Sequence, residues 1–568
     1  MVFQPINDIA EICARRGIIH AVLSPGSRCA PLTLAFVRHP EITTKIIPDE
    51  RSAAFIALGM ALKLNTPVVL ICTSGTAVLN YGPAIAEAFF QHIPLLVLTA
   101  DRPAELIGQQ DGQTIYQEEV YGRHVKKSYC FDGDYTHPEA ASNVTKTLSE
   151  AIALALEFPS GPVHINIPFR EPFFPDRDEP YTYSENIVLA GLPDKDYALT
   201  PDELTTLEMQ WRSFKKILVL GGQGTISDEL EKYLSSIAGK MVVAGDIISN
   251  LHFLEEGINR LDIFPASLDN EFIQKLQPEL LITFGNSTVS NNLKLFLRKH
   301  KPVTHWHIQP QGHAADTYQS LTHVVRTTPE LFFKHVTGWT KIPVVDAAFK
   351  NAWESGESKA ISLVDQFLKE APFGEFVAVQ QVMECLPAYA EVHLANSMPV
   401  RLVNLTGISK DRRDLTIYSN RGTSGIDGSN SAATGMAMVS KHPVVLITGD
   451  MAFFYDRNAF WHNYSVPNLY IVLLNNHAGG IFGVIDGPAA QPELNEYFET
   501  HQKLNARNTA KEYEMDYFYV NSSEELREAL QSFFQSSDKP RILEIETDNE
   551  SNKSIFRQLK RRIAGTYT

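Results

Sequence analysis

Cysteine is scarce in this chain. Its 568 residues include five cysteines, at positions 13, 29, 72, 130 and 385, and no two of them form a CxxC pair. An odd number of widely scattered cysteines is typical of neither a disulfide framework nor a zinc site. The pattern favours reduced, buried thiols in a cytoplasmic protein.

Basic residues are also in deficit. The chain has 50 Lys and Arg against 66 Asp and Glu, which gives a formal net charge of −16. Nucleic acid and anionic membrane surfaces are therefore disfavoured as partners, because no general positive field would recruit them. The sequence lacks a bilayer-length apolar run, and its N-terminal stretch does not have the pattern of a signal peptide. If the substrates are anions, the positive charge must be concentrated in a few arginines.

What the chain does have is an alternation of apolar, strand-like runs with helical stretches along nearly its whole length. The predicted strands lie in IIHAVLSPGS, TTKIIPDE, TPVVLICTSG, IPLLVLTADRP and GPVHINIP of the first third, in KKILVLGG, MVVAGD, ELLITFGN and PVTHWHIQP of the middle third, and in EVHLANS, LTIYSNRG, HPVVLITGD, NLYIVLLNN and RILEIET of the last third. This alternation predicts α/β layers, and the length predicts three domains of ordinary size. Polar, proline-bearing or charged segments near 171–186 and 347–360 are expected to be the linkers. The predicted fold is three doubly wound parallel-sheet domains, at residues 1–185, 190–345 and 360–568.

An internal repeat relates the first and last of these domains. GMALKLNTPVVLIC (59–72) and GMAMVSKHPVVLIT (435–448) match at eight of fourteen positions without a gap, at a constant offset of 376. Two copies of one α/β unit would explain this match. Two unrelated sheets with similar buried strands are the alternative.

Acidic and amide side chains follow two neighbouring strands of the last domain. The run VLIT ends at Gly449-Asp450, and the next apolar run ends at Asn475-Asn476, followed by His477 and Ala478. Ligands of parallel sheets bind at such strand ends. A divalent metal ion prefers oxygen ligands, which Asp450, Asn476 and the carbonyl group of Ala478 could supply together with a diphosphate. His477 is expected to pack or to form a hydrogen bond rather than to catalyse.

This spacing resembles the signature of thiamine diphosphate (ThDP) enzymes. The resemblance implies a homologous pyrimidine-binding domain and diphosphate-binding domain flanking a central domain. It also implies a metal ion, Mg²⁺ or Mn²⁺, and a cofactor that lies between two chains of a homodimer or homotetramer. Glu50 stands where the family places the acid that hydrogen-bonds the pyrimidine ring, and Ile426 where it places the bulky residue that keeps the cofactor bent. The implied cofactor-binding residues are Glu50, Ile426, Gly449, Asp450, Met451, Ala452, Asn476 and Ala478.

Further motifs resemble one family within that superfamily, the menaquinone-pathway synthases of 2-succinyl-5-enolpyruvyl-6-hydroxy-3-cyclohexene-1-carboxylate (SEPHCHC). The motifs are SPGSR (24–28), TADRP (99–103), NSxxxR (396–401), SNRGTSGIDG (419–428) and GGIF (479–482). The family joins 2-oxoglutarate to isochorismate with loss of carbon dioxide. The resemblance therefore implies a transferase with these two substrates.

Arginines in these motifs fit substrates that are dicarboxylates, because a guanidinium group binds a carboxylate through two parallel hydrogen bonds. By family position, Ser397 and Arg401 would meet 2-oxoglutarate, and Arg421 would lie close to the reacting centre. Glu50, Arg401 and Arg421 are the expected catalytic residues.

The isochorismate side is expected to come mainly from the first domain. By family position, Arg28, Arg102 and Gln113 would hold this substrate. Ile481 and Phe482 would form the apolar wall that orients the intermediate. An acetolactate-synthase-like carboligase or a simple 2-oxo acid decarboxylase, built for monocarboxylates, would not need so many arginines. Such an enzyme is the nearest alternative function.

One segment departs from the family pattern. Relatives carry a basic pair in the central domain that helps to bind isochorismate, but this chain has Asn291 and Asn292 there. Either Lys294 replaces the pair or the outer arginines suffice. The glycine-rich run at 218–225 is not GxGxxG, so it is expected to be a structural turn rather than a nucleotide loop. This disfavours an NAD- or CoA-binding regulator, and retention of Glu50 and of the metal motif disfavours a non-catalytic protein.

Overall fold

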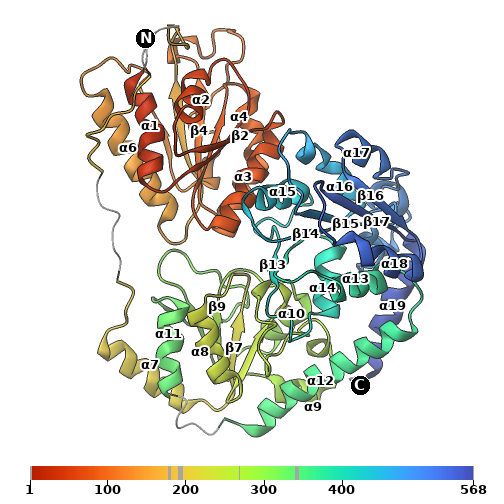
Figure 1. The fold of residues 1–568 in the computed structure, drawn as a ribbon. Helices are drawn as coiled ribbons and strands as arrows, with labels where there is room; N and C mark the ends of the chain where they lie inside the picture. The colour runs from red at the N-terminus through yellow and green to blue at the C-terminus, as the bar shows by residue number, and fades with distance from the viewer. Residues whose placement is uncertain (1–2, 177–180, 190–195, 268, 340–344, 567–568) are drawn as a thin grey trace.

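The computed structural model describes residues 3–176, 181–189, 196–267, 269–339 and 345–566. Three separate β-sheets divide the chain, and every pairing of neighbouring strands within them is parallel (Figure 1). Each of the three predicted domains contains one sheet. The predicted fold class of three parallel-sheet α/β domains is therefore confirmed, whereas their boundaries stay a prediction.

The first domain, red to orange in Figure 1, has a six-stranded sheet in the order β2-β1-β3-β4-β6-β5. Its strands are β1 (His20–Leu23), β2 (Thr43–Ile46), β3 (Val68–Cys72), β4 (Leu95–Asp101), β5 (Ser128–Cys130) and β6 (Val163–Pro168). Its helices are α1 (Gln4–Arg15), α2 (Ala30–Val37), α3 (Glu50–Leu64), α4 (Thr76–Asn80), α5 (Gly82–Gln91) and α6 (Ala140–Leu156).

The central domain has a five-stranded sheet in the order β11-β10-β9-β7-β8. Its strands are β7 (Ile217–Gly221), β8 (Val242–Gly245), β9 (Leu280–Phe284), β10 (Thr304–Ile308) and β11 (His323–Val325). Its helices are α7 (Pro201–Ser213), α8 (Asp228–Ala238), α9 (Asn270–Leu276), α10 (Asn291–Lys299) and α11 (Pro329–Trp339). The glycine-rich run at 218–225 comprises most of β7 and the turn that follows it.

The last domain has a six-stranded sheet in the order β13-β12-β14-β15-β17-β16. Its strands are β12 (Glu391–Leu394), β13 (Thr416–Tyr418), β14 (Val444–Gly449), β15 (Leu469–Asn475), β16 (Asp516–Val520) and β17 (Arg541–Glu546). Its helices are α13 (Glu375–Glu384), α14 (Met398–Thr406), α15 (Ser429–Val439), α16 (Asp450–Tyr455), α17 (Arg507–Glu512), α18 (Ser523–Phe533) and α19 (Asn549–Thr566).

The first and last sheets have the same strand order. If the strands of each domain are numbered from its own first strand, both orders read 2-1-3-4-6-5. The matching segments of the repeat also occupy matching elements, since 59–72 runs from α3 into β3 and 435–448 runs from α15 into β14. The two domains are therefore copies of one unit, as the repeat predicts.

The two copies touch through the glycines that they share. Helix α3 packs against α15, side by side in Figure 1. A methyl group on Gly59 would stand 2.0 Å from the carbonyl oxygen of Ala432, and one on Gly435 would stand 2.1 Å from that of Ile56. Both distances are far below van der Waals contact. Glycine at these two positions therefore lets the helix backbones meet.

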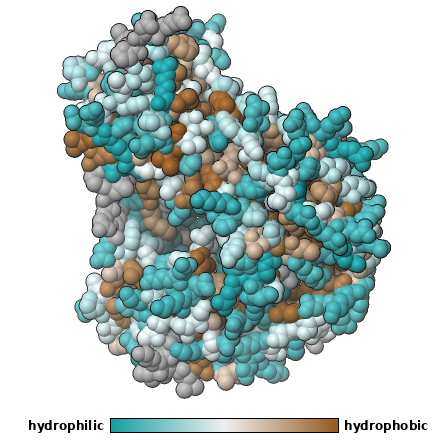
Figure 2. All heavy atoms as spheres, viewed as in Figure 1, coloured by the Kyte–Doolittle hydropathy of each residue, from teal (hydrophilic) through white to brown (hydrophobic). Residues whose placement is uncertain are grey.

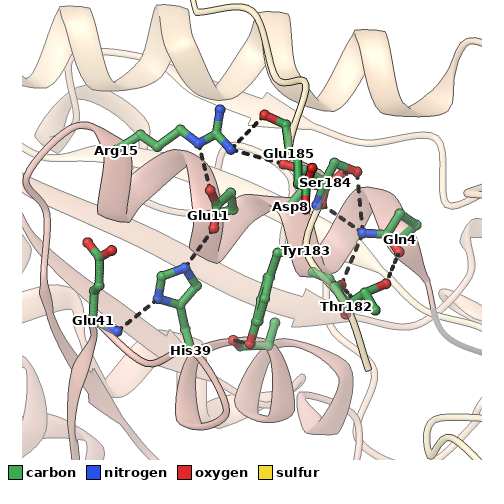
Figure 3. Close-up of polar contacts among 12 residues, drawn as sticks. Gln4, Asp8, Glu11, Arg15, His39, Glu41, Thr182, Tyr183, Ser184 and Glu185 are labelled. Carbon is green, nitrogen blue, oxygen red and sulfur yellow. Dashed lines mark hydrogen bonds and ion pairs between the residues drawn. The ribbon is translucent and has the colours of Figure 1, made fainter. Parts of the chain in front are cut away.

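The segment around Tyr183 and Ser184, where the chain leaves the first domain, is held against that domain (Figure 3). Asp8 of α1 accepts hydrogen bonds from the backbone nitrogen and the hydroxyl group of Ser184, at 2.9 and 2.8 Å. The Tyr183 hydroxyl group donates to the carbonyl group of Ala35 at 2.8 Å, and its ring packs edge-on against His39. The described end of the predicted linker is thus fixed by specific contacts to the first domain.

The second predicted linker, residues 347–360, is the first part of a long helix, α12 (Ala347–Glu370). Its N-terminal half packs on the central domain, where Trp353 meets the ring of Phe264 at 5.4 Å. Its other half reaches the last domain, where Phe367 meets Phe376 at 6.0 Å. The segment is therefore a helical connection between the two domains, with one face of the helix buried.

Candidate functional site

Asp450 and Asn476 stand at the ends of two paired strands, as predicted. β14 and β15 are parallel neighbours with Gly449 opposite Leu474, and Asp450 begins α16 directly after β14. Both side chains are buried, with 3% and 7% of their surface exposed. The Ala478 backbone nitrogen donates to Oδ1 of Asn476 at 2.9 Å, which folds the chain so that Ala478 lies beside the amide group.

The chemistry of this donor set fits a divalent cation such as Mg²⁺. It combines a carboxylate, an amide oxygen and a backbone carbonyl group, all hard oxygen ligands. The described part of the chain has no group of three or more His, Cys, Asp or Glu side chains close enough to hold a metal, so a softer, nitrogen- or sulfur-based site is not formed there. A methyl group on Gly449 would meet nothing within 4 Å, which leaves open space beside Asp450 for phosphate groups.

The structure adds Gln502 to this centre. Its Nε2 donates to Oδ2 of Asp450 at 2.7 Å and to Oδ1 of Asn475 at 3.2 Å. Burial raises the pKa of the Asp450 carboxyl group to about 6, and the Gln502 contact opposes that rise. No sequence signal points to Gln502, because it lies in an irregular polar segment.

A second addition is Glu375, the first residue of α13. Its Oε1 accepts a hydrogen bond from Nδ2 of Asn476 at 2.8 Å. Burial, and next the nearby charge of Asp450, raise the pKa of the Glu375 carboxyl group to about 8. Sequence reasoning missed this residue because it lies far from the strand-end motifs and looks like an ordinary helix start.

Glu50 begins α3 after the end of β2, where the repeat places it, and is half-buried. Its neighbour Arg51 is directed away from it, donating to the carbonyl oxygen of Tyr455 at 2.9 Å. A surface ion pair between Glu50 and Arg51, the ordinary alternative, is therefore not formed. Within the described residues no hydrogen bond or ion pair joins Glu50 to Asp450 or Asn476.

Arg401 and Arg421 come together at the ends of the neighbouring strands β12 and β13. Arg401 donates from Nη1 to the carbonyl oxygen of Ser397 at 2.6 Å, and Arg421 donates from Nη1 to Oδ1 of Asn396 at 2.8 Å. Both are half-buried. Burial lowers the pKa of Arg421, and the charge of Arg401 lowers it further. Two partly desolvated cations whose charges interact favour a bound anion.

The loop that carries Arg421 and Ile426 is fixed to the first domain. Glu87 of α5, 1% exposed, accepts hydrogen bonds from the backbone nitrogens of Gly422 and Thr423 at 2.6 and 2.7 Å. Ile426 is half-buried in this loop, ahead of α15. Sequence reasoning did not single out Glu87, whose helical surroundings are unremarkable.

Arg28 and Arg102 lie at the same edge of the first sheet. Arg28 is 6% exposed and donates from Nη1 to the carbonyl oxygen of Phe169 at 2.8 Å. The backbone nitrogen of Phe169 in turn donates to the carbonyl oxygen of Asp101, next to Arg102. Gln113 is exposed on the loop whose Gly112 carbonyl oxygen accepts from Arg102 at 2.8 Å. Among the described residues no hydrogen bond or ion pair joins this set to Arg401 or Arg421.

The central domain meets the site through α10. Asn292 is engaged with Asp262, donating from Nδ2 to its carbonyl oxygen at 2.6 Å. Lys294 donates from Nζ to the carbonyl oxygen of Thr288 at 2.5 Å. Burial lowers the pKa of Lys294, while the charge of Asp246 raises it and that of Arg421 lowers it. Lys294 thus lies close enough to Arg421 for their charges to interact, and whether it replaces the basic pair stays a prediction.

The remaining expected residues follow β15. Ile481 is half-buried and Phe482 is 36% exposed, with the Phe482 ring 5.9 Å from that of Phe498. Gly479 ties this turn down, since its backbone nitrogen donates to the carbonyl oxygen of Glu499 at 2.7 Å. His477 lies with Nε2 3.7 Å from an oxygen of Glu546, and its expected packing role stays a prediction.

A cavity of about 720 Å³ opens between the first and central domains, and the face drawn in Figure 2 is hollowed where these domains meet. His92, Asn286, His307 and Arg421 are among its lining residues. Asp450 and Asn476 do not line it. Arg421 therefore links this cavity to the substrate side of the site, whereas the metal ligands lie elsewhere.

Comparisons with known proteins agree with this geometry. A family profile described as "Thiamine pyrophosphate enzyme, N-terminal TPP binding domain" matches residues 6–120, and the corresponding C-terminal TPP binding domain matches residues 403–545. Relatives named 2-succinyl-5-enolpyruvyl-6-hydroxy-3-cyclohexene-1-carboxylate synthase align along nearly the whole chain. The protein of Cytophaga hutchinsonii is 43% identical to this chain, in an alignment that covers 99% of this chain and 100% of the relative. The protein of Flavobacterium johnsoniae is 38% identical, with 97% of each chain aligned. The protein of Porphyromonas gingivalis is 35% identical, with 99% of this chain and 97% of the relative aligned.

Proposed function

The chain belongs to the SEPHCHC synthase family of thiamine pyrophosphate enzymes, and from that premise we propose that it makes SEPHCHC from 2-oxoglutarate and isochorismate, with release of carbon dioxide, in menaquinone biosynthesis. The observation that carries the proposal is the pair Arg401 and Arg421. Both guanidinium groups are half-buried, and the charge of Arg401 lowers the pKa of Arg421, so the two cations act on the same part of the site. Both substrates are dicarboxylates, and each needs such partners.

The cofactor is thiamine diphosphate with a divalent metal ion, Mg²⁺ or Mn²⁺. When bound, it supplies the carbon nucleophile and the electron sink for the decarboxylation. Asp450, Asn476 and the Ala478 carbonyl group would hold the metal, and Gly449, Met451 and Ala452 would lie along the diphosphate. Ile426 would press on the cofactor from the loop that Glu87 holds.

Glu50 is the acid that we assign to the pyrimidine ring. A carboxyl group there must hydrogen-bond a ring nitrogen and be partly shielded from water, and Glu50 is half-buried with no side-chain partner among the described residues. Within the described residues no hydrogen bond or ion pair joins it to Asp450 of its own chain. We therefore propose an oligomer, dimer or tetramer, in which the Glu50 of one chain completes the site of another.

We assign the substrates to opposite sides of the site. Ser397, Arg401 and Arg421 would hold 2-oxoglutarate, and Arg28, Arg102 and Gln113 would hold isochorismate. Ile481 and Phe482 would exclude water from the apolar side. Lys294 would add a cation near Arg421, in the segment where Asn291 and Asn292 replace the family's basic pair.

The cysteines bear on where in the cell the protein works. The five cysteines are free, and three of them, Cys13, Cys29 and Cys72, are buried. No helix in the described residues is long and apolar enough to cross a membrane. We propose that the enzyme works in the cytoplasm, where its thiols stay reduced.

The direct test offers the purified protein ThDP, Mg²⁺, isochorismate and one 2-oxo acid at a time. The expected result is SEPHCHC, identified by mass spectrometry, with 2-oxoglutarate and no comparable product with pyruvate. Turnover of pyruvate into acetolactate, with none of 2-oxoglutarate, would replace the proposal with an acetolactate-synthase-like carboligase.

A further inference from the structure

Glu375 is a buried acid beside the metal centre, and it is not one of the expected metal ligands. It lies at the start of α13, and 4% of its surface is exposed. Its backbone nitrogen donates to Oδ1 of Asn552 at 3.0 Å, which holds the helix start against α19. Its side chain reaches the other way, to Nδ2 of Asn476 at 2.8 Å.

The amide group of Asn476 therefore has a defined orientation. A backbone N–H can only donate, so the Ala478 nitrogen at 2.9 Å must face Oδ1 rather than Nδ2. The opposite side of the amide, Nδ2, then faces an oxygen of Glu375. The space around it is small, since a methyl group on Gly480 would come within 2.8 Å of Nδ2.

This orientation matters because only one side of an amide group can bind a metal ion. Oδ1 has two lone pairs, of which the Ala478 nitrogen uses one, so the other can face a cation. A flipped amide would present an NH₂ group, which cannot ligate Mg²⁺. Groups that hold a ligand from behind commonly change metal affinity by tenfold to a hundredfold.

We infer that Glu375 is a positioning residue that holds the Nδ2 of Asn476 and so keeps Oδ1 directed at the metal. It is not itself a ligand in this role, and the described residues contain no three-member group of acidic, histidine or cysteine side chains that could bind a metal together. The inference rests on the proposed function, because it needs the Asp450 and Asn476 pair to bind a metal ion.

The test uses three substitutions with different consequences for the contact. Glu375→Gln keeps an oxygen that can accept from Nδ2 but removes the charge. Glu375→Asp keeps the charge but shortens the side chain by one methylene group. Glu375→Leu removes both. Glu357→Leu is the matched control, since Glu357 is 5% exposed and accepts from the backbone nitrogen of Arg260 at 2.8 Å in another part of the molecule.

Mg²⁺ affinity is measured by calorimetry on the full chain at saturating ThDP, with the melting temperature of each metal-free variant as a check on folding. Glu375→Gln should bind Mg²⁺ within about threefold of wild type, whereas Glu375→Asp and Glu375→Leu should bind it roughly tenfold to a hundredfold more weakly. Glu357→Leu should melt at a lower temperature and keep the wild-type affinity.

Two results would overturn the inference. One is Mg²⁺ affinity within threefold of wild type in all the Glu375 variants, which would make the contact incidental. The other is normal affinity in Glu375→Asp with loss in Glu375→Gln, which would show that charge matters rather than the contact. If Glu375→Leu does not fold, the Asp and Gln variants still decide. Failure of wild type to bind Mg²⁺ and ThDP would instead contradict the proposed function.

Discussion

At the offset of 376 residues that aligns the first and last domains, Glu50 falls opposite Ile426, and Ser74 falls opposite Asp450. Glu50 is the first residue of the buried helix α3 and Ile426 lies just ahead of α15, whereas Ser74 and Asp450 follow the matching strands β3 and β14. One fold copy thus has its acid at the helix start, and the other has its acid at the strand end.

This difference shows how a duplicated unit can build one site. Both copies present side chains at the same two places, because helix starts and strand ends line the same edge of a parallel sheet. Different residue types then give each copy a separate task. In the proposed function, Glu50 hydrogen-bonds the pyrimidine ring, Ile426 keeps the cofactor bent, and Asp450 binds the metal ion. Ser74, 2% exposed and with no partner for its hydroxyl group, has no such task.

The largest expected effect comes from removing each acid in turn. Glu50→Gln should bind Mg²⁺ and ThDP normally but exchange the cofactor's C2 proton about 10²- to 10⁴-fold more slowly, the usual range for loss of acid–base assistance. Asp450→Ala should instead lose metal-dependent ThDP binding. Calorimetry and hydrogen–deuterium exchange separate the two outcomes, and Ser74→Ala, at the position equivalent to Asp450, is the control that should bind normally. Wild-type exchange in Glu50→Gln would remove Glu50 from this role.

The arginines test the same division at the substrates. Arg401→Ala should lower kcat/KM for 2-oxoglutarate by roughly tenfold to a hundredfold, because a hydrogen bond to a charged group contributes about 1.5–3 kcal/mol. Arg28→Ala and Arg102→Ala should raise the KM for isochorismate and leave single-turnover release of carbon dioxide from 2-oxoglutarate unchanged. The comparison breaks if Arg28→Ala blocks that release while Arg401→Ala does not.

The sequence predicted the interior of the three sheets better than their edges. β5 (Ser128–Cys130), β11 (His323–Val325) and β16 (Asp516–Val520) were all missed, and each is the last strand at one side of its sheet. The predicted strands are mostly continuous apolar runs, because they are covered on both faces. Edge strands are short or carry polar residues, so their pattern resembles that of a loop.

The candidate site divides in the same way. Residues at strand ends, such as Asp450 and Asn476, could be predicted because a buried apolar run that stops at a polar residue leaves a local signal. Glu375, Gln502 and Glu87 could not, since each acts through a contact to a residue far away in the chain. Burial and partner, rather than residue type or spacing, identify them, and only the folded structure supplies both.

A smaller effect is expected at the glycines that join the copies. Gly59→Ala and Gly435→Ala should each destabilise the protein by about 1–3 kcal/mol, because each methyl group would overlap a backbone carbonyl oxygen of the other helix. The two losses should be similar, since the contacts are reciprocal. Gly338→Ala, where a methyl group meets nothing within 4 Å, is the control and should melt at or slightly above the wild-type temperature. A loss at only one of the two positions would break the symmetry.

The smallest expected effect concerns Asp456, whose counterpart in the first domain is the exposed Asn80. Asp456 is fully buried and accepts from the backbone nitrogen and the hydroxyl group of Ser431 at 2.7 and 2.8 Å. Burial raises the pKa of its carboxyl group from 3.8 to about 7. Between these values the folded chain holds a proton that the unfolded chain has lost, so this group lowers stability progressively as pH rises from about 4 to 7.

Asp456→Asn gives the second copy the residue of the first and abolishes this proton uptake, while an amide group can still accept from the Ser431 nitrogen. Its melting temperature relative to wild type should therefore rise between pH 5 and pH 8, with the surface substitution Asp486→Asn as the charge control. A difference that stays constant with pH would show that the buried carboxyl group at this position does not titrate in that range.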